Sequence, residues 1–147
     1  MTPVRVERAH LPAIAALERE SFAHPWSEQA LELLCTPTAV GFVLMDGERA
    51  AAYGGMMCVA GEGQITNIAT SPTYRRQGLG EKAMAALVAQ ARERGLYEIS
   101  LEVRESNTPA ISLYEKFGFV AVGKRPRFYT SPVETAIVMV LSLDGEN

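Results

Sequence analysis

One stretch near the middle of the chain constrains the fold most, because it leads from a strand pattern into a helix pattern through a glycine-rich connection. The segment 64–70, "QITNIAT", is rich in β-branched residues and indicates a strand. "SPTYRRQGLG" follows at 71–80, and an apolar stripe at helical spacing then runs from Leu79 to Ala91. A strand, a connection and a helix in this order are typical of α/β domains.

The N-terminal side of this stretch adds further strands and helices. "VRV" at 4–6 predicts a short strand, and apolar residues then recur at helical spacing from Leu11 to Phe22. Ser27 is placed to cap a second short helix. Two strand-like runs then meet at Asp46-Gly47, which is a strong hairpin signal. Together with the strand at 64–70, these runs predict a meander of three strands.

On the C-terminal side, strands and helices alternate. "YEISLEV" at 97–103 alternates as a strand, and Thr108 before Pro109 predicts the N-cap of a helix that ends at Gly118. "FVAVG" and "TAIVMVLSL" predict the last two strands. We therefore expect one domain, residues 1–147, of the α/β class, with a mixed sheet flanked by helices.

Composition excludes several classes of protein. With 147 residues, 48% of them hydrophobic and 21% charged, the chain matches one soluble domain and neither a disordered nor a membrane protein. Its net charge of −3 argues against broad binding to nucleic acid. Charges interrupt the first ten residues, where a signal peptide needs an apolar stretch, so we expect a cytoplasmic protein. Cys35 and Cys58 have no metal-ligand spacing, and we expect no metal.

The connection at 71–80 carries two arginines and two closely spaced glycines before a helix, a pattern that favours a phosphorylated ligand. ATP, a dinucleotide and coenzyme A are the alternatives. A Walker A loop needs lysine and then Ser or Thr directly after its last glycine. Here Gly80 is followed by Glu81, Lys82 and Ala83, which excludes that loop.

The segment "GLGEKA" satisfies the relaxed dinucleotide fingerprint G-x-G-x-x-A, and Glu98 lies near the distance expected of a ribose-binding acid. That fingerprint begins at the end of its strand, whereas here a long connection separates Thr70 from Gly78. The pattern R-x-x-G-x-G at 75–80 fits coenzyme A, because glycines let backbone N–H groups approach a pyrophosphate and arginines suit further phosphates. For this motif alone, an exposed turn with solvated arginines remains the alternative.

Two longer segments, "NIATSPTYRRQGLG" and "LEVRESNTPAISLYEKFGF", resemble the acetyl-CoA half of GCN5-related N-acetyltransferases (GNAT). "SFAHPWSE" and "LEVRESN" are similar to segments of the bacterial ribosomal-protein alanine N-acetyltransferases. The resemblance covers about 4–141. It implies a GNAT-like mixed, mostly antiparallel sheet flanked by helices, acetyl-CoA as co-substrate without a metal, and N-acetyltransferase activity.

The resemblance also implies which residues form the site. Backbone groups of Ile68, Ala69 and Thr70 would contact the pantetheine and acetyl group, and Asn107 would contact the cofactor from the start of the next helix. The family's catalytic glutamate and tyrosine fall on Glu102 and Tyr114. The remaining cofactor-binding residues belong to the turn, and they are Arg75, Arg76, Gln77, Gly78, Leu79, Gly80 and Glu81.

The chemistry needs these types of residue. A terminal amine, with an ordinary pKa of about 7.7 to 8.0, is mostly protonated near pH 7, so a base must remove a proton before the amine attacks a thioester. Glu102 would be that base, acting through a water, and Tyr114 would donate to the leaving thiolate. A backbone N–H near Ala69 would stabilise the oxyanion. The alternatives are a solvated or paired carboxylate at Glu102 and an aromatic ring that packs against the sheet at Tyr114.

Trp26 and Tyr129 are the candidate substrate-binding residues, and His24 is a candidate second base. His24 and Trp26 lie between the first two expected helices, which border the acceptor cleft in this family. A purely structural role is the alternative for each. The segment "KRPRFYTSPVET" departs from the ribosomal subgroup mainly by Pro126 and a different polar run, close to the expected acceptor site.

Three functions follow as hypotheses. The favoured one is acetylation of the N-terminal α-amine of a protein, with an alanine of a ribosomal protein as acceptor. The others are acetylation of a small amine, such as a polyamine or an amino acid, and a non-catalytic acetyl-CoA-binding regulator. The expected partner is a protein or peptide N-terminus, with no nucleic acid and no membrane, and the expected state is a monomer or weak dimer. Carboxylates such as Glu102 and Glu134 are expected to favour an acceptor with a cation near its N-terminus.

Overall fold

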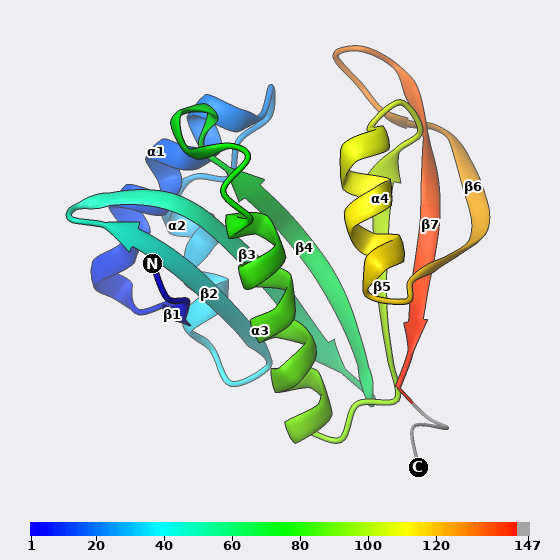
Figure 1. Ribbon diagram of the computed structural model, residues 1–147, viewed down its shortest axis with the longest axis horizontal. Coiled ribbons are helices and arrows are strands. Elements are labelled where there is room, and N and C mark those ends of the chain that lie inside the picture. Colours follow the sequence, from blue (N-terminus) through cyan, green and yellow to red (C-terminus); the bar gives the residue numbers. More distant parts are fainter. Residues whose placement is uncertain (144–147) are drawn as a thin grey trace.

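The computed structural model describes residues 1–143, which form a seven-stranded sheet with helices on both faces (Figure 1). The strand order is β1-β2-β3-β4-β5-β7-β6. All neighbouring strands are antiparallel except β4 and β5, which are parallel. The prediction of an α/β fold with a mixed, mostly antiparallel sheet is therefore confirmed.

The first half of the sheet is an antiparallel meander. The strands are β1 (Val4–Arg5), β2 (Ala39–Asp46), β3 (Arg49–Val59) and β4 (Glu62–Thr70). The predicted hairpin forms between β2 and β3, where Gly47 takes the left-handed conformation (φ 62°) that a tight turn requires. All three strands of the predicted meander, β2, β3 and β4, are present. Helices pack against both of its faces.

Helices α1 (Leu11–Ser21) and α2 (Glu28–Leu31) cover one face of this meander, and a 3-10 turn (Glu32–Cys35) continues α2. Ser27 caps α2 as predicted, because its side chain accepts a hydrogen bond of 3.1 Å from the N–H of Ala30. The segment 22–27 connects the two helices. We call it the α1–α2 loop.

The second half alternates as expected, with α3 (Leu79–Glu93), β5 (Glu98–Arg104), α4 (Thr108–Lys116), β6 (Val120–Tyr129) and β7 (Glu134–Ser142). The prediction of Thr108 as the N-cap of α4 is wrong by one residue. The cap is Asn107, whose side-chain oxygen accepts a 3.2 Å hydrogen bond from the N–H of Ala110. This shift turns the Asn107 side chain towards the start of α4.

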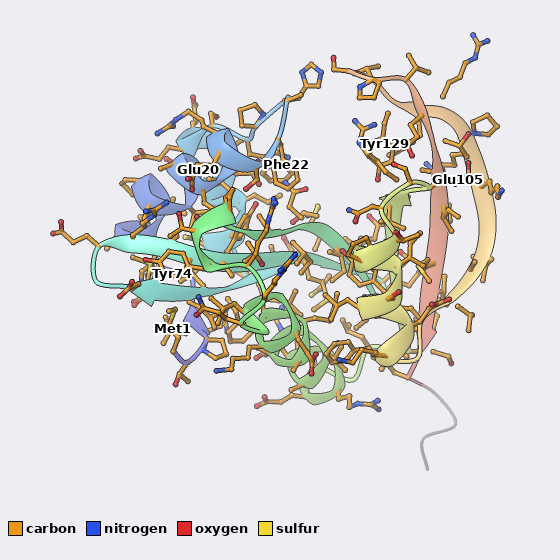
Figure 2. All side chains as sticks on the ribbon, turned by 45° about the horizontal axis from the view of Figure 1, so that its top comes forward. Met1, Glu20, Phe22, Tyr74, Glu105 and Tyr129 are labelled. Carbon is orange, nitrogen blue, oxygen red and sulfur yellow. The ribbon has the colours of Figure 1, made fainter. Side chains whose placement is uncertain are left out.

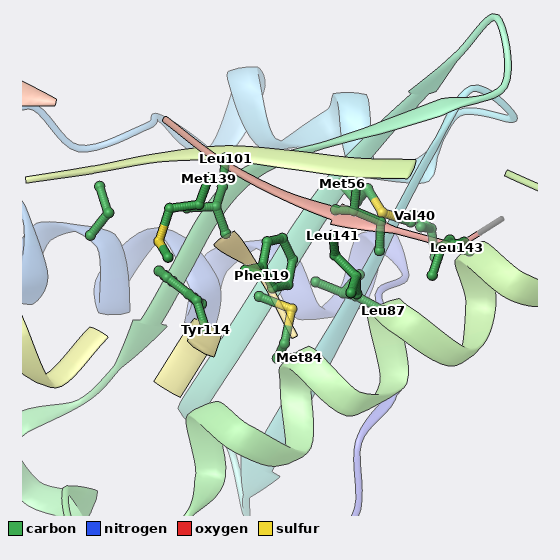
Figure 3. Packing of buried hydrophobic residues seen from close by; sticks show 13 residues of the cluster. Val40, Met56, Met84, Leu87, Leu101, Tyr114, Phe119, Met139, Leu141 and Leu143 are labelled. Atoms are coloured by element: carbon green, nitrogen blue, oxygen red, sulfur yellow. The ribbon is translucent and has the colours of Figure 1, made fainter. Parts of the chain in front are cut away.

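Helices α3 and α4 share one apolar core on the face opposite α1 (Figures 1 and 3). Met84 and Leu87 of α3 pack there with Phe119, Met139 and Leu141, and all five side chains are buried. Figure 3 shows Tyr114 of α4 at the edge of the same cluster. This core fixes the two helix N-termini at the same end of the sheet.

The single parallel pair opens the sheet. Strands β4 and β5 pair only at Glu62–Gln64 with Glu98–Ser100, and beyond this point they diverge (Figure 1). A bulge in β4 lies beside the point of divergence, because Met56 pairs with Ile65 while Gly55 pairs with Asn67. The gap between the strands therefore exposes backbone groups of β4 that have no neighbouring strand.

Candidate active site

Two pockets meet at the gap between β4 and β5. One, with a volume of about 390 Å³, is lined by the α1–α2 loop, the diverging strands and the end of β6, and we call it the central pocket. The other, of about 570 Å³, is lined by the end of β4, by residues 75–76 and 78–81 and by the N-terminal part of α4, and we call it the turn pocket. Ile68, Asn107 and Tyr114 line both pockets, so a ligand in one can reach a ligand in the other.

The turn pocket has the features of an anion site. Arg76 (φ 67°) and Gly78 (φ 72°) both take the left-handed conformation, and a Cβ at Gly78 would meet no atom within 4 Å. Gly78 needs to be glycine because of its backbone conformation rather than crowding. It is also the N-cap of α3, whose first N–H groups have no partner within the helix and which carries the positive end of its dipole there. Arg75 and Arg76 add charge at the same pocket.

Most of the predicted cofactor-binding residues line the turn pocket. They are Ile68, Thr70, Arg75, Arg76, Gly78, Leu79, Gly80, Glu81 and Asn107. Gln77 and Ala69 do not line it. Glu81 forms an ion pair of 2.7 Å with Lys116 of α4, which ties the two helices together.

The direction of the β4 backbone groups explains why Ala69 does not line the turn pocket, although its neighbours Ile68 and Thr70 do. The N–H of Ser71 donates to the carbonyl of Ala51 on β3, and the backbone groups of an antiparallel strand point alternately to its two sides. Those of Ala69 therefore face β3, whereas those of Ile68 and Thr70 face the gap. The Ala69 side chain is buried in the core beneath α1.

Glu102 extends from β5 into the central pocket with its side chain 32% exposed. Its Oε2 lies 4.0 Å from the guanidinium of Arg125 on β6, and the Arg125 side chain is itself 59% exposed. An exposed pair at this distance is weak. The carboxylate is thus accessible from the pocket and only loosely held.

Tyr114 lies on α4, is 8% exposed and lines both pockets. Burial, and then the nearby Tyr129, raises the pKa of Tyr114 to about 12. Its ring also packs against Phe119, with the centroids 5.9 Å apart. The two interpretations that the sequence left open are compatible, because the ring is part of the core while the residue lines the site.

Tyr129 lies at the end of β6 and lines the central pocket opposite Phe22, as Figure 2 shows. The guanidinium of Arg104 stacks 4.5 Å from its ring centroid. Burial raises the pKa of Tyr129, and the Glu102 carboxylate raises it further. Both Tyr129 and Trp26, the two predicted substrate-binding residues, therefore line the pocket that contains Glu102.

Glu134 does not line the central pocket. It accepts a hydrogen bond of 2.6 Å from the N–H of Ser106 and pairs with Arg104 at 3.2 Å. Arg104 also donates to the carbonyls of Thr130 and Pro132, so these residues hold the β6–β7 turn against β5. Glu134 thus stabilises this turn. Its charge is paired with that of Arg104, so we do not assign it to the attraction of a cationic acceptor.

His24 joins the two loops that border the central pocket. Its Nε2 lies 3.2 Å from the Oγ of Ser131 and 3.3 Å from the Oγ1 of Thr130, both in the β6–β7 turn. His24 and Thr130 line the pocket. The contact closes one side of the pocket between the α1–α2 loop and that turn.

Asn67 and Glu18 were not predicted from the sequence. Asn67 lines the central pocket from the β4 bulge, and its amide donates to Glu18, a fully buried carboxylate on α1. One signal was present, because Glu18 follows Ile14 by four residues and so lies on the apolar face of its helix. A charged side chain in such a position is seldom buried without partners.

Membrane-spanning helices and metal clusters are both absent from the described part of the chain. Among residues 1–143, no helix is long and apolar enough to cross a membrane. In the same range, no three His, Cys, Asp or Glu side chains gather as ligands of a metal ion would.

Comparison with known proteins relates this site to a family. Residues 11–119 match the model of the acetyltransferase (GNAT) family. A relative from Escherichia coli (strain K12), named [ribosomal protein bS18]-alanine N-acetyltransferase, is 36% identical over 140 residues, which are 94% of this chain and 95% of the relative.

Two solved structures extend the comparison. The crystal structure of the ribosomal-protein-S18-alanine N-acetyltransferase from Escherichia coli matches with a TM-score of 0.88 and 37% identity, over 99% of this chain and 97% of that one. The structure of a streptothricin acetyltransferase homologue from Bacillus anthracis str. Ames, in complex with acetyl coenzyme A, matches with a TM-score of 0.65 and 25% identity, over 74% of this chain and 65% of that one. The chain belongs to the acetyltransferase (GNAT) family and is an N-acetyltransferase.

Proposed function

We propose that this enzyme transfers the acetyl group of acetyl-CoA to the N-terminal α-amine of a protein, and that the acceptor is the terminal alanine of a ribosomal protein. The observation that carries the proposal is the junction of the two pockets, where Tyr114 borders both and Glu102 faces one. The names of the relatives supply the acceptor class.

The turn pocket fits the pyrophosphate of acetyl-CoA. The free N–H groups at the start of α3, the open space at Gly78 and the charges of Arg75 and Arg76 suit an anion that approaches the backbone closely. We assign the pantetheine contacts to the gap-facing backbone of Ile68 and Thr70, with Asn107 at the junction. When bound, acetyl-CoA supplies an activated acetyl thioester.

Glu102 is the proposed base. An N-terminal amine in the central pocket needs to lose a proton before it can attack, and Glu102 is a carboxylate accessible from that pocket. Its weak pairing with Arg125 leaves it free to accept a proton directly or through a water. Because an α-amine has an ordinary pKa of about 7.7 to 8.0, only a modest shift is needed to deprotonate it.

Tyr114 is the proposed donor to the leaving thiolate. With a pKa of about 12 its hydroxyl stays protonated at neutral pH and can donate a hydrogen bond. Full proton transfer to a thiolate whose conjugate thiol has an ordinary pKa of about 8.5 would be uphill by roughly 5 kcal/mol at these values. Tyr114 therefore acts chiefly through a hydrogen bond that strengthens as negative charge develops on the sulfur.

The walls of the central pocket support a peptide acceptor. Trp26 and Phe22 come from the α1–α2 loop and Tyr129 from β6, so aromatic side chains from both halves of the sheet surround the proposed amine position. Such rings provide apolar contact area for the first residues of a peptide. We assign Trp26 and Tyr129 to acceptor binding.

The test is an acceptor panel. The protein is mixed with acetyl-CoA and one acceptor at a time, which is an N-terminal peptide, a lysine peptide or a small amine. The free thiol of the released coenzyme A is then measured over time. We expect release with peptides that have a free N-terminal alanine. Faster release with polyamines or amino acids than with every peptide would assign the enzyme to small amines. No release with any acceptor, although acetyl-CoA binds, would favour a regulatory module.

A further inference from the structure

A buried carboxylate lies behind the acceptor side of the site. Glu18 of α1 is 0% exposed and lines neither pocket. Its Oε1 accepts a 2.8 Å hydrogen bond from the N–H of Trp26, and its Oε2 accepts one of 2.8 Å from the amide of Asn67 and another from the hydroxyl of Tyr53. Three donors from different parts of the chain thus converge on one carboxylate.

Two of these donors belong to the central pocket. Trp26 lies in the α1–α2 loop and Asn67 in β4, and both line the pocket. The third donor, Tyr53 of β3, is buried in the core and does not line it. Glu18 is therefore bonded to two residues of the pocket lining, although its own buried side chain does not line the pocket.

The β4 bulge is what turns Asn67 towards Glu18. A Cβ on Gly55 would meet the Oγ1 of Thr66 at 2.6 Å and Leu34 at 2.8 Å, so Thr66 faces the side of the sheet that carries α1 and α2. Asn67, the next residue, faces the same side because it bonds to Glu18. Two successive residues share a face only where a strand is bulged.

We propose that Glu18 is a positioning residue for the acceptor, which fixes the main chain of the α1–α2 loop at Trp26 and the side chain of Asn67 in the central pocket. The proposal rests on the proposed peptide acceptor. It assigns Glu18 no contact with substrate and no part in proton transfer.

A purely structural role makes a different prediction. Burying a carboxylate is costly, and an apolar residue of similar volume often packs as well or better at such a position. If Glu18 only filled space, an apolar replacement would leave the site unchanged. If it positions the loop, removal of its acceptor oxygens frees the Trp26 N–H and shifts the walls of the pocket, while the turn pocket stays intact.

The experiment compares Glu18→Met with Glu18→Gln. Methionine has a similar volume but cannot replace the acceptor oxygens. Glutamine keeps an oxygen for the Trp26 N–H, and its NH2 group can donate to Tyr53, whose hydroxyl also accepts, and to Asn67 with its amide reversed. We expect Glu18→Met to raise the KM for an N-terminal peptide at least about tenfold, with kcat and the Kd for acetyl-CoA within about threefold. Glu18→Gln is expected to keep the KM within about threefold of the wild type.

Tyr53→Phe is the matched control. It removes the third donor but leaves the Trp26 and Asn67 bonds, so we expect a lower unfolding temperature with an unchanged peptide KM. A wild-type KM in a folded Glu18→Met variant would overturn the proposal. So would equal increases of KM in the Met and Gln variants, because the effect would then not depend on the acceptor oxygen.

A second readout needs no acceptor. Trp26 is the single tryptophan of the chain, so its fluorescence reports on the α1–α2 loop. We expect greater quenching by acrylamide in Glu18→Met than in Glu18→Gln. In the wild type, the Trp26 amide should exchange with solvent at least about tenfold more slowly than a free amide. Rapid exchange would overturn the proposal even if Glu18→Met did not fold.

The two proposals fail in different ways. If no peptide is acetylated by the wild type, the proposed acceptor is wrong, whereas fluorescence and amide exchange still report whether Glu18 holds the loop. If peptides are acetylated but Glu18→Met behaves as the wild type, the acceptor class stands and the role of Glu18 does not.

Discussion

Tyr114 belongs to the core and also lines both pockets of the proposed active site. Its ring contributes to the core between α4 and β7, while its hydroxyl is buried enough to keep a raised pKa of about 12. We predict that Tyr114→Phe preserves the packing and leaves the Kd for acetyl-CoA within a few-fold. Turnover should fall by roughly 10²-fold or more, the usual size of a lost donor to a leaving group. Calorimetry and initial rates measure the two effects.

A control variant shows whether the loss of turnover depends on the position of the lost tyrosine hydroxyl. Tyr74 bonds to Asp46 and lines neither pocket, so Tyr74→Phe should keep wild-type turnover. Wild-type turnover in Tyr114→Phe would reduce Tyr114 to a packing residue.

Glu102 allows a test by pH. If it is the base for an α-amine, wild-type turnover should rise with pH as the amine loses its proton, and Glu102→Gln should need a higher pH to reach a comparable rate. Glu105→Gln is the matched control, since Glu105 is close in sequence but pairs with Lys124 at 2.6 Å outside both pockets. Identical pH profiles for the wild type and Glu102→Gln would exclude the assignment.

The N-terminus of α3 is the element to which we assign the pyrophosphate of acetyl-CoA. Gly78→Glu adds a negative charge beside the first N–H groups of the helix and a side chain in the turn pocket. We predict that the Kd for acetyl-CoA rises at least about tenfold, which corresponds to about 1.4 kcal/mol. Calorimetry measures this directly.

Gly95 provides the matched control at the other end of α3. It has the same φ of 72° and the same open surroundings as Gly78, so Gly95→Glu introduces a comparable backbone strain and the same charge away from the pocket. Acetyl-CoA affinity should be unchanged in Gly95→Glu. Equal losses of affinity in the two variants would attribute the effect to strain in α3 and not to phosphate binding.

The link between β7 and the end of β5 should make stability depend on pH. Hydrogen bonds from Ser106, and then Arg104, hold the pKa of Glu134 below its usual range. A carboxyl group with a lowered pKa in the folded state stabilises the fold above its unfolded pKa, about 4.3, and loses this contribution as the pH falls through the folded value. The difference in melting temperature between wild type and Glu134→Gln should therefore shrink below about pH 4. A difference that does not depend on pH would contradict this.

The elements that local chemistry determines were predictable. The hairpin at Asp46-Gly47 and the Ser27 cap depend on a few adjacent residues, and both form. The cap of α4 was misplaced because Asn107 and Thr108 are both good caps, and only the hydrogen bond to Ala110 distinguishes them. Strand β6 extends well beyond "FVAVG", because its pairing with β7 continues past Gly123.

What the sequence could not predict depends on distant contacts. Glu18 and Tyr53 are 35 residues apart, and Glu18 and Asn67 are 49 apart, so no local pattern links them. The paired state of Glu134 likewise needs Ser106 and Arg104 from another part of the chain. The family resemblance indicated the turn and the residues Glu102 and Tyr114. The convergence of three hydrogen-bond donors on Glu18 is visible only in three dimensions.

The whole molecule is organised around the divergence of β4 and β5. The helix N-termini of α3 and α4 form the turn pocket, while the α1–α2 loop on the other face and the end of β6 form much of the central pocket. Under the proposed function, two substrates approach from different sides and meet at Tyr114, which lines both pockets. This arrangement suits direct transfer between them, without an acetylated enzyme residue.

The position of the acetyl group on a peptide tests this arrangement most directly. We would incubate the enzyme and acetyl-CoA with a peptide that begins with alanine followed by arginine, and with an N-terminally blocked copy containing lysine, and locate the acetyl group by fragment mass spectrometry. We predict acetylation of the alanine α-amine in the first peptide and almost none of the second. Preferential acetylation of lysine in the blocked peptide would contradict the proposed acceptor.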